Sequence, residues 1–126
     1  MIRDAVTLSV GDELLAGETL DTHGRTIAAS LSARGCRVLQ HRVLGDDVSN
    51  IAAAIVAGTA DADLVVITGG LGPTLDDVSR EALAEAMNES LVEDPASRAH
   101  LDQWYAGRGR VMPVGNVRQA LRPASA

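Results

Sequence analysis

Three pairs of acidic residues follow three predicted strands, and carboxylates in such positions can bind a metal ion or activate water. The pairs are Asp12-Glu13, Asp46-Asp47 and Asp76-Asp77. Because parallel strands end at the same edge of a sheet, where α/β proteins bind ligands, we expect the pairs to converge. Six carboxylates at one edge repel one another and any phosphate, so the pattern indicates a hard divalent cation such as Mg²⁺ between protein and phosphate.

The third pair follows a glycine-rich segment typical of a phosphate-binding turn. Gly69, Gly70 and Gly72 come directly after the apolar stretch 64–67 and before a predicted helix. Glycine permits close approach of a backbone to a ligand, and the start of a helix offers free N–H groups. We therefore expect these glycines to hold a metal-bridged pyrophosphate or nucleotide.

Each of these features also has a purely structural explanation. A single carboxylate after a strand is a common helix N-cap, and Thr74 with Asp77 fits a capping box. Arg25 and Arg80 are expected on solvated helix faces, and Trp104 and Tyr105 are expected to pack rather than stack on a base. Three convergent acidic pairs are harder to explain by capping alone.

Composition excludes several classes of protein. The 126 residues are 46% hydrophobic, which is enough for one small domain with a sizeable core. The net charge is −6 and all eleven basic residues are arginine, so a Walker-type lysine is absent and general nucleic-acid binding is not expected. The chain has no apolar run long enough for a membrane span, and its single cysteine fits a reducing cytoplasm.

The elements that must position these residues alternate between strand and helix. Apolar runs predict strands over 5–10, 36–44 and 64–67, while helical spacing predicts helices over 23–34, 49–60 and 75–88. Residues 12–22 read as a loop, and Asp94-Pro95 predicts the start of a further helix toward Tyr105. Val117–Leu121 reads as a short turn. This order predicts an α/β domain with a mostly parallel sheet and right-handed crossovers.

Several motifs together resemble the N-terminal domain of the CinA (competence/damage-inducible) family. They are Gly11-Asp12-Glu13-Leu14-Leu15-Ala16-Gly17, Asp21-Thr22-His23, Val43-Leu44-Gly45-Asp46-Asp47, Thr68-Gly69-Gly70-Leu71-Gly72-Pro73-Thr74-Leu75-Asp76-Asp77 and Met112-Pro113-Val114-Gly115-Asn116-Val117-Arg118-Gln119-Ala120-Leu121. That domain is similar to the MoaB/MogA molybdopterin-binding domains. The resemblance implies a three-layer α/β/α fold, with residues 1–126 forming one domain.

The resemblance also implies a function and a set of site residues. CinA-type domains are associated with metal-dependent hydrolysis of ADP-ribose and related nucleotide pyrophosphates. By motif position, Asp46 and Asp77 are expected to be catalytic, and Asp12, Asp46 and Asp77 to bind Mg²⁺, Mn²⁺ or Co²⁺. The expected phosphate-binding or nucleotide-binding residues are Thr68, Gly69, Gly70, Leu71, Gly72 and Thr74.

Two alternatives stay open at this point. One is molybdopterin binding, with or without adenylyl transfer, and the other is a non-catalytic ligand-binding or oligomerisation module. The family's usual segment after Arg122-Pro123 is not matched, so the domain is expected to lack a C-terminal strand and part of the pocket. Nothing in the chain resembles the family's nicotinamide mononucleotide deamidase domain. A small-molecule nucleotide or pterin ligand and a homodimer or homotrimer are expected, with no nucleic-acid or membrane partner.

Overall fold

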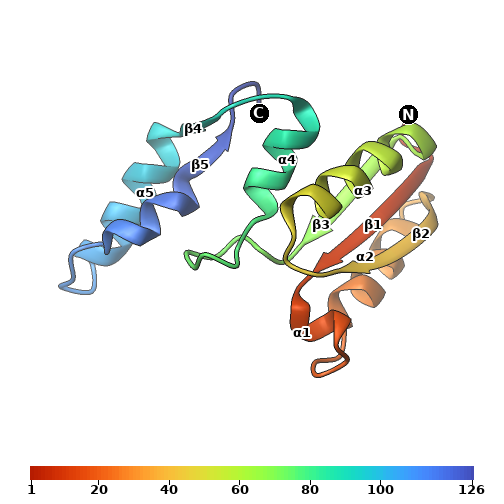
Figure 1. Cartoon of the computed structure of the whole chain (residues 1–126), viewed down its shortest axis with the longest axis horizontal. Helices are drawn as coiled ribbons and strands as arrows, with labels where there is room; N and C mark the ends of the chain where they lie inside the picture. The colour runs from red at the N-terminus through yellow and green to blue at the C-terminus, as the bar shows by residue number, and fades with distance from the viewer.

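A three-stranded parallel sheet with helices on both faces forms one half of the molecule (Figure 1). The computed structural model describes residues 1–126. The strand order is β2-β1-β3, and both neighbours run parallel to β1. Helix α2 covers one face and α3 the other, with α4 packed beside α3. This is the expected α/β/α arrangement. Its elements are β1 (Asp4–Val10), α1 (Asp12–Leu15), α2 (Thr22–Ser32), β2 (Arg37–Leu44), α3 (Val48–Asp61), β3 (Leu64–Thr68) and α4 (Ser79–Met87).

The remaining elements form a C-terminal arm that projects from this half (Figure 1). The arm consists of residues 91–123: β4 (Leu91–Glu93), α5 (Pro95–Ala106), the 3₁₀ helix η1 (Val114–Ala120) and β5 (Leu121–Pro123). Strands β4 and β5 pair antiparallel in a small sheet of their own. The arm contacts the rest of the chain mainly through α4.

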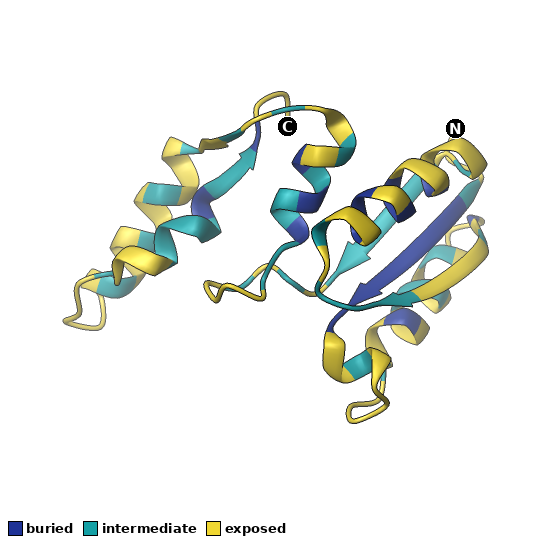
Figure 2. Ribbon diagram, viewed as in Figure 1, coloured by how far each residue is buried: buried dark blue, intermediate teal, exposed yellow.

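The hydrophobic core lies on the sheet half, between β1, α3 and α4 (Figure 2). It contains Val6, Leu8, Val10, Ile51, Ala54, Ile55 and Ala82, each almost fully buried. Small alanines on α3 and α4 let the two helices approach the aliphatic strand closely. In contrast, α5 has no buried residue.

Three helices begin at aspartates that cap them. Asp21, Asp47 and Asp94 each accept a hydrogen bond from the backbone N–H three residues later, at 3.0, 2.8 and 2.8 Å. The structural explanation is therefore correct for Asp47, whose carboxylate begins α3. Gly35, with φ of +77°, ends the turn after α2 in the left-handed region.

The two free edges of the sheet differ in chemistry. Strand β2 carries Arg37 and Arg42 with other polar side chains, as expected of an edge that water covers. Strand β3 is apolar from Leu64 to Ile67, and these residues are only half-buried. A groove of about 500 Å³ runs along β3 and is lined partly by Val65, Ile67 and Leu83.

No helix is both long enough and apolar enough to cross a membrane.

Two expectations about elements were wrong, and two short strands were not foreseen. The predicted loop 12–22 begins with a helical turn, α1. Helix α4 starts at Ser79, not at 75, so Asp76 and Asp77 lie in the preceding loop. Strands β4 and β5 were not predicted, because three residues each are too few to show a period of two.

Candidate functional site

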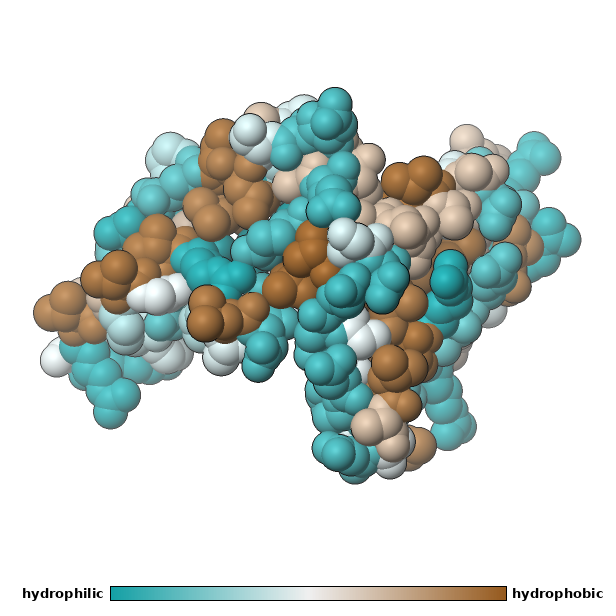
Figure 3. Space-filling view, viewed as in Figure 1, coloured by the Kyte–Doolittle hydropathy of each residue, from teal (hydrophilic) through white to brown (hydrophobic).

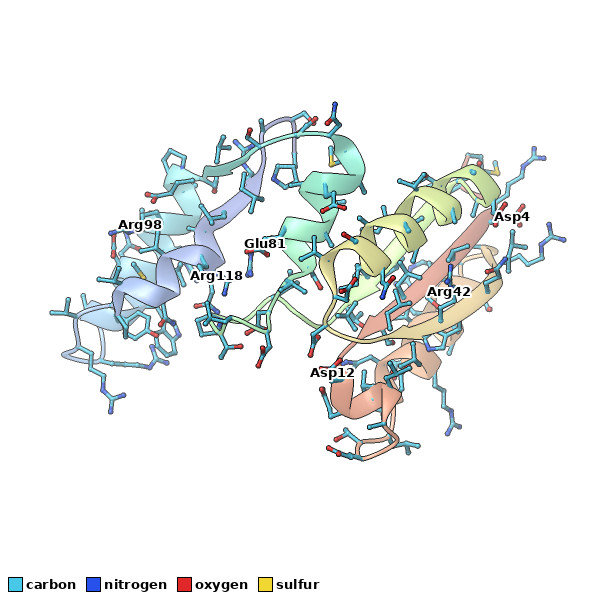
Figure 4. The ribbon with its side chains drawn as sticks, viewed as in Figure 1. Asp4, Asp12, Arg42, Glu81, Arg98 and Arg118 are labelled. Atoms are coloured by element: carbon cyan, nitrogen blue, oxygen red, sulfur yellow. The ribbon has the colours of Figure 1, made fainter.

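Two of the predicted acids meet at the carboxyl end of the sheet. Asp12 follows β1 and Asp46 follows β2, and each carboxylate accepts the backbone N–H of the other residue. The distances are 3.2 Å from Asp12 N to Asp46 Oδ2 and 2.8 Å from Asp46 N to Asp12 Oδ1. Figure 4 shows Asp12 at this lower edge of the sheet half. The reciprocal bonds fix two carboxylates side by side on adjacent strand ends.

The electrostatic environment of Asp46 is uniformly acidic. Burial raises the pKa of its carboxyl above the ordinary value, and the charges of Asp12, Glu13 and Asp76 raise it further. The hydrogen bond from Asp12 only partly opposes this shift. We call Asp12, Glu13, Asp46 and Asp76 the acidic edge. The clustered negative charges favour the binding of a proton or of a metal cation at the acidic edge.

Asp77 does not join this group. Its Oδ2 accepts hydrogen bonds from the backbone N–H and the hydroxyl of Thr74, at 2.9 and 2.6 Å. These bonds, from the Thr74 hydroxyl first, lower the pKa of Asp77 despite the opposing effect of burial. The predicted Thr74–Asp77 capping pair thus forms, but it closes the loop before α4 instead of lying within the helix. Of the two neighbouring acids Asp76 and Asp77, it is Asp76 whose negative charge raises the pKa of Asp46.

The predicted three-carboxylate metal site is accordingly not assembled by the protein alone. Asp12 and Asp46 are together, Asp77 is engaged with Thr74, and no group of three His, Cys, Asp or Glu side chains could hold a metal ion. Mg²⁺ commonly takes only one or two carboxylates, with phosphate oxygens and water completing its shell. The residues therefore fit a cation shared with a phosphate ligand and do not fit a closed protein cage.

Residues 69–78 form a loop between β3 and α4, which we call the glycine loop. Gly69 and Gly70 have φ of +86° and +65°. A Cβ on Gly69 would collide with the carbonyl oxygen of Val10, and one on Gly70 with the hydroxyl of Ser79. The Ser79 hydroxyl also donates to Gly69 O at 2.7 Å. Glycine is thus required here by the protein's own packing, and its predicted role in phosphate binding stays a prediction.

Two arginines hold the carbonyl groups of the glycine loop. Arg80 of α4 donates to the carbonyls of Leu71 and Gly72. Arg118 of η1 donates to the carbonyls of Thr74 and Asp77 and forms an ion pair with Glu81, 2.6 Å long. In Figure 4, Arg118 and Glu81 point toward one another from η1 and α4. Arg80 was expected on a solvated face. Instead it lies half-buried, and burial, followed by the charge of Arg118, lowers its pKa against the opposing charges of Glu81 and Asp77.

A cavity of about 210 Å³ opens beside the glycine loop at the carboxyl ends of β1 and β3. Thr68, Gly69, Glu13, Asp21 and His23 contribute to its walls. Two of the predicted ligand-binding residues, Thr68 and Gly69, therefore line a cavity. Leu71, by contrast, is 52% exposed and lines the separate groove along β3.

A hydrogen-bonded chain supports one wall of this cavity. His41 of β2 lies 2.6 Å from Asp21 through Nε2 and 2.6 Å from the buried hydroxyl of Thr7 through Nδ1. Gly24 makes room for the imidazole, since a Cβ there would collide with the ring. Although burial raises the pKa of Asp21, hydrogen bonds from Gly24, Ser9 and His41 lower it overall. Together these hydrogen bonds fix Asp21 and the start of α2 against the sheet.

His41 and Arg118 were missed by reasoning from the sequence. His41 stands alone in a polar strand face, and Arg118 lies more than 40 residues from the loop that it holds. For His41, the period-two position in line with Thr7 on the neighbouring strand was an available signal. For Arg118 there was none in the local sequence.

Comparison with known proteins agrees with this architecture. Residues 6–122 match the family described as probable molybdopterin binding domain. CinA from Thermoplasma acidophilum, described as of unknown function, superposes with a TM-score of 0.91 at 31% identity, covering 98% of this chain and 72% of that one. MoaB from Thermus thermophilus has the same fold, with a TM-score of 0.65 at 24% identity over 96% of this chain and 73% of that one.

Longer curated proteins also match. A CinA-like protein of Deinococcus deserti is 47% identical over 116 residues, which are 92% of this chain and 29% of that protein. A Shewanella oneidensis protein named nicotinamide-nucleotide amidohydrolase PncC is 37% identical over 94% of this chain and 28% of its own length. The chain thus spans less than a third of the curated relatives that it matches.

Proposed function

The chain belongs to the family of probable molybdopterin-binding domains, as a CinA-type member, and from this premise we propose that it hydrolyses nucleotide pyrophosphates of the ADP-ribose type with a divalent cation. The observation that carries the proposal is the Asp12–Asp46 pair, in which reciprocal hydrogen bonds hold two carboxylates together among further acids. The pair also joins the ends of β1 and β2 through these two backbone N–H groups. It suits a cation that bridges to phosphate.

Each carboxylate of the pair keeps one oxygen free for a ligand. Asp46 Oδ1 and Asp12 Oδ2 have no hydrogen-bond partner in the protein, since the reciprocal bonds use the other two oxygens. A divalent cation bound there would neutralise phosphate charge and make a bound water more acidic. The raised pKa of Asp46 indicates a carboxylate whose negative charge the protein does not compensate, which favours binding of a cation at this position.

The remaining residues of the site position the glycine loop and shape the space for a ligand. Arg80 and Arg118 fix the carbonyls of the glycine loop, so the loop keeps one conformation beside the acidic edge. The cavity next to Thr68 and Gly69 offers space for a sugar or phosphate group at the strand ends. We assign no step to Asp77, because both of its bonds from Thr74 serve the loop.

Hydrolysis of ADP-ribose tests the proposal directly. We expect the purified chain to release AMP and ribose 5-phosphate with Mg²⁺, Mn²⁺ or Co²⁺, and none after chelation. Asp46→Asn should remove the activity and weaken Mn²⁺ binding measured by calorimetry, whereas Asp61→Asn, the same change at the far end of α3, should alter neither. Absence of turnover with every metal would refute the proposal.

Molybdopterin binding is the second candidate, and the family match over residues 6–122 favours it. The same acidic edge, with a bound divalent cation, would then orient a pterin phosphate without hydrolysis. Tight pterin binding by a chain that leaves ADP-ribose intact would establish this candidate. A chain that binds neither pterin nor nucleotide would instead be a non-catalytic module.

A further inference from the structure

A second cavity lies on the other side of the glycine loop, between the loop and the C-terminal arm. Its volume is about 390 Å³, and its walls include Pro73 of the loop, Trp104 and Tyr105 of α5, and Asn116 and Gln119 of η1. This cavity lies on the arm side of the loop, away from the notch that Figure 3 shows between the loop and the lobe that contains α1. Aromatic rings and side-chain amides thus meet next to the loop.

The polar groups of this cavity have unused hydrogen-bonding capacity. Asn116 donates both amide hydrogens, to Tyr105 Oη at 2.8 Å and to Gln119 Oε1 at 3.1 Å. This leaves the Asn116 carbonyl oxygen as an acceptor, and the Gln119 amide and the Tyr105 hydroxyl as donors. The Asn116 carbonyl oxygen and the Gln119 amide nitrogen have no hydrogen-bond partner in the protein and are not fully buried, so both keep some contact with solvent. The cavity wall therefore offers an acceptor and a donor to a ligand, with the Tyr105 hydroxyl hydrogen as a further donor.

The aromatic side chains are also unusually open. Trp104 is 45% exposed, and Tyr105 meets it edge-on with ring centroids 5.0 Å apart. The guanidinium of Arg108 covers one face of the indole at 3.6 Å. Both rings pack against neighbouring side chains, as expected, but Trp104 keeps nearly half of its surface available for further contacts.

The glycine loop connects this cavity to the cavity at the strand ends. Gly69 lines the cavity at the strand ends. Pro73, four residues later in the loop, lines the cavity between the loop and the arm. The acidic edge lies at the same end of the sheet as the first cavity. The same loop therefore borders both cavities.

We infer that the cavity between the loop and the arm binds the planar nitrogen heterocycle of the ligand whose phosphates lie at the glycine loop. The inference rests on the proposed function and adds the class of group recognised. Donors and acceptors side by side on a ring edge are common to purines and pterins, and they match the acceptor and donors that Asn116, Gln119 and Tyr105 present. The purine of a nucleoside diphosphate sugar suits the phosphate-centred arrangement best, and its second sugar would occupy the cavity beside Thr68.

Trp104 provides the test, because it is the only tryptophan in the chain. Titration with AMP should change its fluorescence, whereas ribose 5-phosphate and inorganic pyrophosphate should bind, as measured by calorimetry, without changing it. Gln119→Ala should weaken AMP binding about tenfold, through one lost hydrogen bond, and leave pyrophosphate binding unchanged. A parallel titration with a pterin phosphate decides which heterocycle is preferred.

Gln103→Ala is the matched control. It removes the same side-chain amide from an exposed position of α5 that does not line the cavity, so AMP binding should stay at the wild-type value. If AMP binds to wild type and Gln119→Ala equally, with no change in Trp104 fluorescence, the inference is wrong while the phosphate site stands. If pyrophosphate and ribose 5-phosphate also fail to bind, both the inference about this cavity and the proposed function are wrong.

Discussion

Asp46 differs from the other acids whose pKa is shifted. The pKa values of Asp21, Asp63, Asp77, Glu89 and Asp94 are all lowered by hydrogen bonds that favour the charged form, whereas that of Asp46 is raised. A lowered pKa indicates a carboxylate already satisfied by the protein. A raised one indicates a carboxylate whose charge is unfavourable until something else compensates it, which is typical of functional groups.

This difference predicts that Asp46→Asn separates activity from stability. Because the folded-state pKa of Asp46 is raised, the protonated carboxyl stabilises the fold more than the ionised carboxylate does. This stabilisation by the protonated form is present at low pH and is lost as the pH rises through the folded-state pKa. At pH 7 the neutral asparagine should leave the melting temperature unchanged or higher. Turnover of ADP-ribose should fall about 100-fold or more. A large drop in melting temperature would show that Asp46 is chiefly structural.

Asp77 should show the opposite behaviour. Its lowered pKa means that its stabilisation is present above the ordinary aspartate value of 3.8 and is lost as the pH falls through the folded-state value. We expect Asp77→Asn to reduce the free energy of unfolding at pH 7, and the difference from wild type to shrink below about pH 4. Urea unfolding at several pH values measures this. A difference from wild type that is equally large at every pH would contradict this role of the ionised Asp77 carboxylate.

The sequence predicted that acids follow the strands, but it did not predict which of them meet. Asp76 and Asp77 have the same chemistry and adjacent positions, and only the loop conformation distinguishes them. That conformation depends on Thr74 nearby and on Arg118, 41 residues after Asp77. Local patterns contain no information about a contact of that length, and metal binding by Asp77 stays a prediction.

At the scale of elements, the arm and the glycine loop are joined by one side chain. Arg118 of η1 reaches two loop carbonyls and Glu81 of α4 simultaneously. Without it, Glu81 would be left partly buried with no cationic partner, and one of its oxygens is already without a partner. The position of the arm and the shape of the loop should therefore change together.

Replacing Arg118 by methionine tests this link. We expect the free energy of unfolding to fall by about 2 kcal/mol, because charge-assisted hydrogen bonds between half-buried groups are lost. The backbone amides of residues 74–78 should also exchange their hydrogens faster. Arg98→Met provides the comparison: its ion pairs with Glu93 and Asp102 lie on the surface and should cost about 0.5 kcal/mol or less. Equal losses for the two variants would contradict the link.

Periodicity located most of the elements correctly. Long segments with a clear apolar pattern, such as α3 (Val48–Asp61), were found within a residue or two of their observed ends. Errors arose where tertiary contacts decide the boundary. Helix α4 begins at Ser79 because the Ser79 hydroxyl bonds to Gly69 O and the preceding loop closes on Asp77 instead. Short strands in the arm depend on each other for pairing, so neither could be recognised alone.

At the scale of the whole molecule, the buried core and the arm are distributed unequally. All seven residues of the core cluster belong to the sheet half and α4, while α5 contributes no buried residue. Local stability follows the density of buried apolar contacts. The arm should therefore open in a step that leaves the sheet intact.

Native-state hydrogen exchange can detect such a step. We expect amides of α5 to exchange at least about tenfold faster than those of β1, after correction for intrinsic rates, which corresponds to an opening free energy lower by about 1.4 kcal/mol. Bound AMP should slow exchange in α5 if the arm contributes to the ligand site. Uniform protection throughout the chain would instead mean that arm and sheet unfold as one unit.

The unequal edges of the sheet also limit how copies of this chain could associate. The arginines and other polar side chains of β2 discourage pairing at that edge, whereas the apolar β3 has no such protection. If two copies pair edge to edge, the chemistry of the sheet favours β3 against β3 about a two-fold axis. Such a contact is complete with two chains and presents polar β2 edges at both ends. The asymmetry of the sheet therefore favours a closed pair and disfavours an endless fibre.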